Sequence, residues 1–402
     1  MPTIDTNTLS VRAIEEVTFG TTPATPTLQE IRVTGDSLVP AKNTITSDII
    51  RTDASVDSIL RTLISMSGGL PIEVVYGAEF ELFLTGLMRS SIVSAFELGT
   101  IDVAVDTPGV GQATITGTGT AFLTSLTTDA IGAMVRFWDN AVSIGVGKIE
   151  SITDTVIVVT DANSSFSAVT GGGDEQVDVR YIRNGTTLRS YSIEEEVISD
   201  VPTSFFAVSS GARVAGLSLA LTAEGILTGE WTFEGLDLAP SASAIAGETV
   251  TPPLDTKPLS ASGDVNEIWE GDVFNNCITD LSISITNNPR VQAVIGQETP
   301  KGIGFGRFTP TGNISFLKAD NLLLDKLRAH TATSLDIFGT DQDDNVLVIT
   351  IPQVRYVDGG DEKSGVDSDV MFSGGWGAER DASMGDNGAM MQFSLFPSAP
   401  LT

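Results

Sequence analysis

Apolar and polar residues alternate along much of the chain, most regularly between residues 212 and 235. From 217 to 222, leucine fills every second position, and serine, alanine and threonine fill the others. Further on, Leu227, Trp231 and Phe233 are separated by threonine, glycine and glutamate. A period of two is typical of strands that bury one face and leave the other polar. The pattern predicts a hairpin of two strands, 212–222 and 225–235, with a short turn between them.

Two stretches place apolar residues at helical spacing instead. In the first, Phe80, Phe83 and Leu84 begin an apolar face that continues to Met88. Acidic residues lie near its start, where they favour the helix dipole. The second stretch ends at Leu327, with leucine also at positions 323 and 324. Each stretch follows a predicted strand, so the sequence predicts two strand-then-helix units.

The two strand-then-helix units belong to an internal repeat. Segments that begin at Val33, Val214 and Ile278 share one pattern. An apolar residue is followed by three other residues, then by serine, then by leucine or isoleucine. Val33 precedes the first helical stretch by about the same spacing as Ile278 precedes the second. The repeat predicts two tandem copies of one α+β unit, each with many strands and one helix. A general similarity among β-rich segments is the alternative.

Changes in composition predict the domain organisation. Residues 100–180 are rich in Gly and Thr and predict a small all-β insertion. Prolines near the start predict an extended arm, and a Pro/Ser/Ala/Thr-rich stretch predicts a linker. A polar segment, 35–67, lacks regular periodicity and is expected to bind a partner. The predicted divisions are an N-terminal arm (1–27), a first domain (28–99 and 181–237), the insertion (100–180), a linker (238–263) and a second domain (264–402).

Acidic residues outnumber basic ones by 52 to 22, which gives a formal net charge of −30. Such a charge repels phosphates, so the composition excludes tight binding of DNA or RNA but allows DNA to slide past a surface. The single cysteine, Cys277, excludes an internal disulfide and is expected to be a small buried apolar group. The sequence shows no secretory signal and no apolar run of ~18 residues. It therefore predicts folding in a cytoplasm and no membrane partner.

Candidate catalytic groups are few. The single histidine, His330, ends the second predicted helix, where a cation favours the dipole, and no serine lies in a Gly-x-Ser-x-Gly elbow. The glycines at 302–306 lack the Lys-Ser/Thr of a phosphate loop. Acidic runs at 341–345 and 358–362 could bind a hard cation, but hairpin turns are the favoured interpretation. Residues 194–196 are expected to form an exposed strand end. The sequence predicts no enzyme activity, cofactor or metal site.

Several segments together carry a family resemblance. Residues 19–38, 43–51, 191–196 and 225–235 resemble the tail tube (major tail) proteins of long-tailed bacteriophages, and the resemblance skips the insertion. It implies a mainly β (α+β) fold with two tandem tail-tube domains, each a β-sandwich or barrel with one flanking helix, plus the small inserted all-β domain. In this family, subunits join edge to edge into rings that stack into a tube. Two domains per chain therefore imply a trimeric ring with pseudo-sixfold symmetry.

The resemblance also implies where the protein acts and with what. It would be assembled in the bacterial host cytoplasm and located in the virion tail. Its partners would be further copies of itself, together with tail terminator, tape measure and distal tail proteins. Viral double-stranded DNA would pass through the tube without specific binding. The sequence leaves open which face of the strands lines the tube.

Two sets of residues are candidates for these contacts. Polar strand positions are the candidates for the lumen: Thr228, Glu230, Thr232, Glu234, Asn313 and Ser315. The polar segment supplies the candidates for contact between rings: Asp36, Asn43, Thr46, Asp48, Arg51, Asp57 and Arg61. One alternative function is a carbohydrate- or surface-binding adhesin of a virion, built on the insertion. Another is a hydrolase that acts through acidic pairs such as Asp343 and Asp344.

Overall fold

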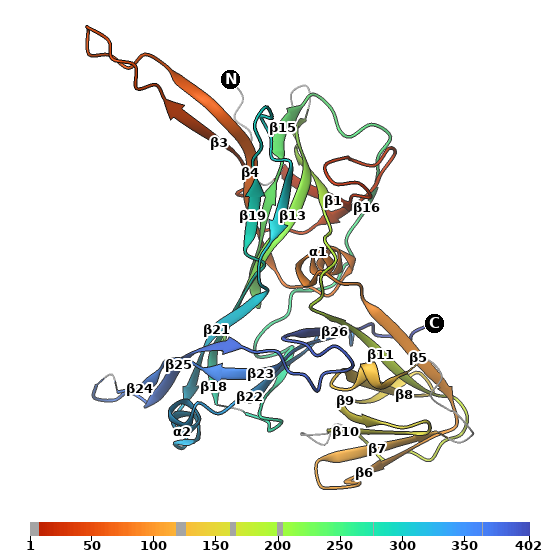
Figure 1. Cartoon of the computed structure of the whole chain (residues 1–402). Coiled ribbons are helices and arrows are strands. Elements are labelled where there is room, and N and C mark those ends of the chain that lie inside the picture. Colours follow the sequence, from red (N-terminus) through yellow and green to blue (C-terminus); the bar gives the residue numbers. More distant parts are fainter. Residues whose placement is uncertain (1–7, 118–125, 161–165, 199–203, 276, 364) are drawn as a thin grey trace.

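The computed structural model of the chain describes residues 8–117, 126–160, 166–198, 204–275, 277–363 and 365–402. The fold is mainly β, with two short α-helices among the strands (Figure 1), which confirms the predicted fold class. Within these ranges no helix is both long enough and apolar enough to cross a bilayer. Some residues lie outside the described ranges: residues 1–7 of the predicted N-terminal arm (1–27), and residues 118–125 and 161–165 of the predicted insertion.

The first part of the chain is built around one long strand. Its strands are β1 (Leu9–Glu15), β2 (Thr27–Ile31), β3 (Val39–Thr46), β4 (Ile59–Glu73), β12 (Tyr191–Val197), β13 (Phe205–Thr222), β14 (Thr228–Gly235), β15 (Asp237–Ser241) and β16 (Thr249–Thr251). The first half of β13 pairs with β12 and β15, and its second half pairs with β14. Gly211 lies where β13 changes partners and has a φ of 64°, which glycine adopts without a Cβ clash.

Three sequence expectations can be located in this part. The predicted hairpin is β13–β14, in which Leu217 lies opposite Trp231. The polar segment 35–67 is more regular than its sequence suggested, because β3 and the first half of β4 pair along it. We call this projecting hairpin, residues 39–67, the arm (Figure 1). The segment 238–263, where a linker was expected, contains β15 and β16, which pair with β13 and β2.

The second part of the chain contains β17 (Val265–Glu270), β18 (Ile278–Thr286), β19 (Pro289–Gln292), β20 (Gly302–Phe305), β21 (Thr309–Leu317), β22 (Thr333–Thr340), β23 (Val346–Tyr356), β24 (Gly360–Glu362), β25 (Met371–Ala378) and β26 (Gln392–Phe396). The helix α2 (Leu322–Ala329) follows β21, as predicted from the leucine spacing. In the first part, α1 (Ala78–Met88) follows β4 in the same way.

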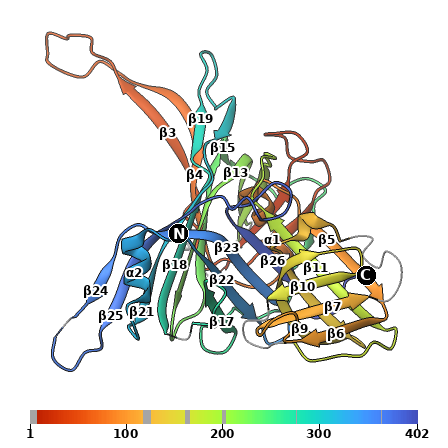
Figure 2. The ribbon, with the colours of Figure 1, turned by 60° about the horizontal axis from the view of Figure 1, so that its bottom comes forward.

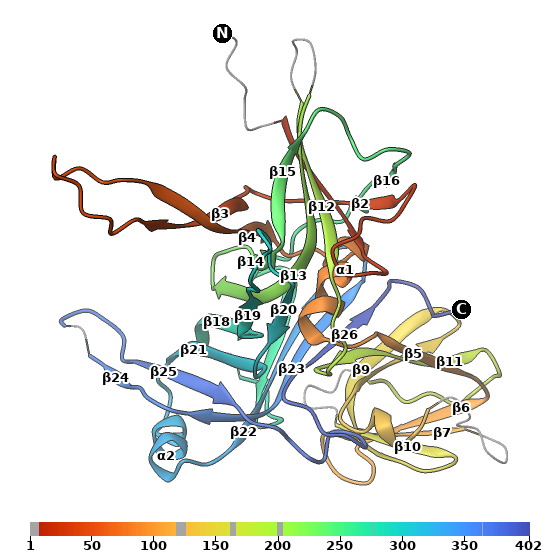
Figure 3. The same ribbon diagram turned by 45° about the horizontal axis from the view of Figure 1, so that its top comes forward.

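One continuous sheet joins the two parts (Figures 1 and 3). Its strands follow the order β3–β4–β14–β13–β18–β21–β25–β24, and all neighbours are antiparallel. The join is the pairing of residues 216–222 of β13 with residues 280–286 of β18, which we call the seam. Backbone hydrogen bonds therefore connect the two parts along the seam.

The segment between α1 and β12 forms a smaller β-structure with its own apolar core. Its strands are β5 (Val93–Gly99), β6 (Ile101–Val105), β7 (Gln112–Gly117), β8 (Met134–Asp139), β9 (Val142–Ile152), β10 (Val156–Thr160) and β11 (Glu175–Arg183). It packs against the second part of the chain (Figure 2). Arg136 donates hydrogen bonds to the carbonyl oxygens of Asp344 (2.8 Å) and Pro397 (2.9 Å). This small β-structure is therefore fixed to the rest of the molecule.

The main core lies between the continuous sheet and α1. The Phe83 ring centroid is 4.9 Å from that of Phe233, 5.4 Å from that of Tyr191 and 5.8 Å from that of Trp231. The first turn of α1 is held by ion pairs, including Arg32 Nε to Glu79 Oε1 at 2.6 Å. By contrast, α2 has no fully buried residue. The two helices occupy matching places in the chain order but contribute unequally to the core.

We therefore expect Phe83→Ala to destabilise the protein by about 3–5 kcal/mol, because it removes a fully buried ring and leaves a cavity. Leu324→Ala on α2 is the matched control and should cost clearly less, because that side chain is half-buried. Thermal unfolding followed by tryptophan fluorescence measures both, since Trp231 contacts Phe83. Equal losses in the two variants would contradict this account of the core.

Candidate functional site

One face of the continuous sheet is polar across both parts of the chain. Glu230 lies opposite Ser218, Ser218 opposite Ser284, and Ser284 opposite Thr311. Directly opposed residues of antiparallel strands point to the same face, so these side chains form a row across the seam. The next row contains Thr228, Ala220, Ser282 and Asn313. We call this surface the polar face.

The structure places all six lumen candidates on the polar face. Thr228, Glu230, Thr232 and Glu234 alternate along β14, with the buried Trp231 and Phe233 pointing the other way. Asn313 and Ser315 alternate in the same manner along β21. The sequence named positions on two distant strands, and the sheet brings them onto one surface. Their contact with a lumen stays a prediction.

Many positions of the polar face carry small side chains, so the surface over these strands is shallow. A shallow hollow of ≈ 500 Å³ lies over β14, β13 and β18, lined by Gly69, Gly216, Ser218, Glu230, Thr232 and Thr286 among others. The Glu230 side chain lies across Gly69, where a Cβ would come within 2.3 Å of Glu230 Oε1. Carboxylates of Glu73 and Asp280 lie on the same face. Its charge is therefore of the kind that repels phosphate.

The seam itself depends on a close approach of two backbones. Gly216 lies at an irregularity in the β13–β14 register and opposite Thr286 of β18. A Cβ at this position would lie 2.5 Å from the carbonyl oxygen of Ile285. On the opposite face, Leu217, Leu219 and Ile283 are buried, so the seam has an apolar side that excludes water.

The arm carries six of the seven ring-contact candidates. Asn43 and Thr46 lie on β3, Arg61 lies on β4, and Asp48, Arg51 and Asp57 lie in the tip between them. Arg51 Nη1 is 2.6 Å from Asp57 Oδ1, and Arg61 pairs with Glu298. The arm also exposes large apolar side chains that the sequence reasoning passed over: Ile45, Ile49, Ile50, Val56, Ile59 and Leu60. Ile50 is 97 % exposed, which a polar-segment interpretation does not predict.

Asp36, the seventh candidate, lies below the arm and faces Glu195 of β12. Burial, followed by the charge of Asp36 and a hydrogen bond that protonated Glu195 donates to Asp36, raises the pKa of Glu195 to about 8. Burial also raises the pKa of Asp36, although the Leu38 N–H donates to its carboxylate at 2.7 Å. The two carboxyl groups therefore share a proton near neutral pH. Glu195 was missed because the pair joins residues far apart in the chain.

Residues 194–196 do not form an exposed strand end, contrary to expectation. Glu194 is fully buried, and Arg12 Nη1 lies 3.1 Å from its Oε1. Arg12 also pairs with Glu196 and with Glu248. The guanidinium of β1 neutralises this acidic group on the neighbouring strand, which the local sequence of β12 could not reveal.

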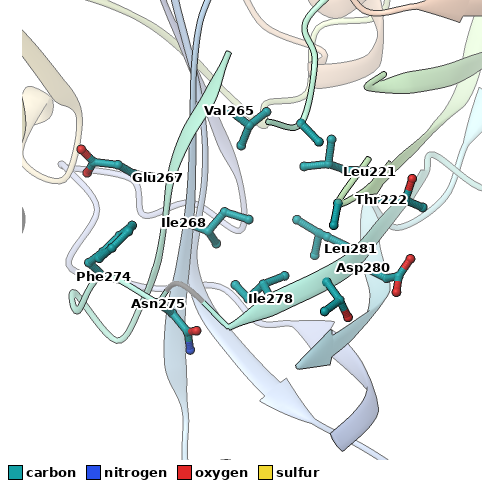
Figure 4. A pocket seen from close by; sticks show the side chains of 13 residues that line it. Leu221, Thr222, Val265, Glu267, Ile268, Phe274, Asn275, Ile278, Asp280 and Leu281 are labelled. Atoms are coloured by element: carbon teal, nitrogen blue, oxygen red, sulfur yellow. The ribbon is translucent and has the colours of Figure 1, made fainter. Parts of the chain in front are cut away.

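A pocket of ≈ 200 Å³ lies at the end of the seam farthest from the arm (Figure 4). Leu221 and Leu281 line one side, and Ile268 and Phe274 line the other. Within the described residues, no group of three or more His, Cys, Asp or Glu side chains is arranged to hold a metal ion. Glu267 and Asp280 also line the pocket, so its wall mixes apolar side chains with carboxylates.

The other candidate groups have structural places. Asp341 caps the β22–β23 turn by accepting hydrogen bonds from the N–H groups of Asp343 (2.9 Å) and Asn345 (2.8 Å). His330 is the C-cap of α2, with a φ of 52°, at the helix end predicted for it. Cys277 is half-buried rather than fully buried.

Comparison with known proteins decides the family. A family model described as "Phage tail tube protein" matches residues 6–390. The chain belongs to the phage tail tube protein family. Tail tube proteins are structural components of the virion tail, so this tail tube protein is a structural protein of a bacteriophage virion.

Other comparisons add little to the family match. No curated protein matches the chain. Among solved structures, the phage phi92 endosialidase aligns at 10 % identity over 85 % of this chain and 54 % of its own, with a TM-score of 0.16. This chain thus spans about half of that protein's length. A likeness at that score carries no argument, for the adhesin alternative or for any other.

The Asp36–Glu195 pair predicts how stability depends on pH. An acid whose pKa is raised by folding stabilises the folded state below its unfolded pKa, and this stabilisation is lost as the pH rises through the folded pKa. The unfolding temperature should therefore fall as the pH rises from about 5 to about 8, and Glu195→Gln should reduce that fall. Glu196→Gln is the control, because Glu196 pairs with Arg12. Equal slopes in wild type and Glu195→Gln would contradict the shared proton.

The close approach at the seam predicts a second effect. Gly216→Val should destabilise the protein by about 1–3 kcal/mol, because the new side chain must push β13 and β18 apart. Ser218→Val is the control, since that position already carries a Cβ on the same face of the same strand. Chemical unfolding of both variants measures the change in the free energy of unfolding. An unchanged free energy of unfolding in Gly216→Val would show that the two backbones can separate at the seam without cost.

Proposed function

We propose that the protein is the structural subunit of a phage tail tube that assembles into stacked rings and conducts DNA from capsid to host. The observation that carries the proposal is the continuous sheet, which presents one polar face across two similar units of one chain. Three copies would supply six such units and form a trimeric ring with pseudo-sixfold symmetry. We assign the two units to the predicted first and second domains, although β5 (93–99) and the last residues of β11 (181–183) belong to the inserted β-structure.

The polar face is the surface that we assign to the lumen. Its serine, threonine and glycine positions carry no large side chain that would obstruct passing DNA. Glu230 and Asp280 keep phosphates from adhering, because like charges repel and no counterions are released on contact. The apolar face is already occupied by the core, so the polar face is the one available to a water-filled channel.

The arm is the part that we assign to contact between rings. It projects beyond the sheet (Figure 3) and exposes isoleucine, valine and leucine side chains. Exposed apolar groups of this extent mark a binding surface. Charged arm residues such as Arg51 and Asp57 would then fix the orientation of the contact.

The remaining partners follow from a tube of finite length. A tail terminator protein would close one end, distal tail proteins the other, and a tape measure protein would occupy the lumen before DNA does. Viral double-stranded DNA would pass without specific binding. Assembly would take place in the host cytoplasm, with no membrane partner.

Electron microscopy of the purified protein tests the assembly directly. We expect rings or tubes, and native mass measurement of a single ring should give three chains. A strictly monodisperse monomer at high concentration under all conditions would overturn the proposal. Rings of six chains would overturn the trimer while leaving the tube.

A charge reversal tests the lumen assignment. Assembled Glu230→Lys tubes should retain short duplex DNA, because added cations release counterions from DNA. This retention should be about tenfold stronger at about 50 mM salt than at about 200 mM. Glu224→Lys is the control: it changes the net charge equally but lies in the exposed turn between β13 and β14. Retention that rises equally in both variants would contradict the assignment.

A further inference from the structure

A lysine of the small β-structure reaches into the second part of the chain. Lys148 lies on β9, opposite Met134 of β8, on the surface that packs against β17, β22 and β23 (Figure 2). Its Nζ is 3.3 Å from Oδ2 of Asp336, a residue of β22. The same Nζ contacts the carboxylate of Asp272, in the loop that follows β17. One amine thus meets two carboxyl groups, each from a different element.

The two carboxyl groups lie in different surroundings. Asp336 is fully buried, whereas the Asp272 side chain is 48 % exposed. The opposed neighbours of Asp336 in the sheet are Trp269 of β17 and Thr350 of β23. Trp269 packs against Phe338, with their ring centroids 4.4 Å apart. The first carboxyl group is therefore enclosed beside aromatic rings, and the second is open to water.

Burial makes a permanent ion pair at this place costly, because two charges are kept out of water. Burial raises the pKa of Asp336, although the charge of Lys148 acts in the opposite direction. Burial also acts to lower the pKa of Lys148, but the charges of Asp336 and Asp272 outweigh it, so that this pKa is raised. The proton therefore rests on the lysine. Its transfer to Asp336 removes both buried charges and leaves an amine beside a carboxylic acid, which is the reactive pair for amide formation.

We infer that Lys148 and Asp336 join in an intramolecular isopeptide bond, with Asp272 as the proton carrier. The Nζ of Lys148 attacks Cγ of protonated Asp336, so that a C–N bond forms and the C–O bond to the hydroxyl group breaks. The Asp272 carboxylate accepts a proton from Nζ and delivers it to the departing hydroxyl group, which leaves as water. The amine and the carboxyl group are consumed, Asp272 is regenerated, and neither an oxidant nor a cofactor is required.

The fold supplies what this condensation lacks in free solution. Groups that are held in contact react as if at very high concentration. Exclusion of water from Asp336 disfavours the reverse reaction, which is hydrolysis. A carboxylate placed against the amine accelerates the proton transfers. Because Asp272 is half-exposed, the released water can leave on its side.

A second lysine pair in the same part of the chain lacks this arrangement. Lys326 Nζ is 2.6 Å from Oε2 of Glu270, and Glu270 is also buried. Among the described residues, Lys326 has no second carboxylate within ion-pair distance. We therefore expect the Lys326–Glu270 contact to stay an ion pair, so that it serves as a comparison within one molecule.

The bond would change how the small β-structure is attached. Lys148 and Asp336 are 188 positions apart, so their linkage closes a long loop that includes the seam strands. Such a closed loop restricts the unfolded chain and so favours the folded state. The contact between the small β-structure and the second part of the chain would then be covalent as well as apolar.

Mass spectrometry of the unfolded wild-type chain tests the bond directly. Wild type should be lighter than its sequence by one water, and Lys148→Arg should have the mass of its own sequence. Tryptic digestion should give a branched peptide that joins Lys148 to Asp336, while Lys326 and Glu270 stay in separate peptides. A chain at full mass, with Lys148 and Asp336 in separate peptides, would leave an ion pair only and overturn the inference. Loss of water without the branched peptide would overturn it as well.

Asp272→Asn tests the proton carrier. In timed cell-free synthesis, the linked fraction of this variant should rise about a hundredfold more slowly than that of wild type, because a positioned base is lost. Asp361→Asn is the matched control: it removes the carboxylate that lies 2.5 Å from Lys318 and should link at the wild-type rate. Equal rates in Asp272→Asn and wild type would contradict the role of Asp272. Both measurements are made on single chains, so their outcome does not depend on tube assembly.

Discussion

The backbone pairing of β13 with β18 is the constraint on which the rest of the molecule depends. It makes one sheet from two units, and the strict alternation of side chains along a strand then fixes both surfaces at once. A slip of one residue would turn Leu217, Leu219 and Ile283 towards water and bury Ser218 and Ser284. The apolar core beneath the seam therefore enforces the register that assembles the polar face.

Helix packing and charge pairing complete this arrangement unevenly. Phe83 of α1 contacts Trp231 and Phe233 on the buried side of the sheet. The core of the first unit is therefore enclosed by the sheet on one side and by α1 on the other. The second unit has a half-buried helix and relies instead on the small β-structure, through Arg136 and an apolar cluster that includes Trp269 and Phe338. The inserted segment does for the second unit part of what α1 does for the first.

Local pattern predicted a large share of this structure. The leucine alternation gave the hairpin and its buried face, and helical spacing located α1 and α2, because both signals come from residues close together in the chain. The polar positions of β14 and β21 were identified by the same alternation. The arm was harder, because its strands expose both faces and so carry no single apolar period.

The errors have one physical cause, which is pairing between distant residues. Glu194 was expected to be exposed because its charge is visible in the sequence while its partner Arg12, 182 positions away, is not. Glu195 and Asp36 meet for the same reason. The family resemblance supplied the fold class and the idea of a tube, but the seam register follows only from the three-dimensional structure.

The attachment of β11 to the far end of the described chain has a consequence for synthesis. Tyr181 lies opposite Ser394, and the Leu401 N–H donates to Asp178 Oδ2 at 3.0 Å. At a ribosomal rate of about 5–20 residues per second, strand β11 waits roughly 10–40 s for these partners to be made. Contacts of such long sequence separation form late. On a ribosome, the small β-structure therefore cannot complete its attachment to the second part of the chain until β26 has been made.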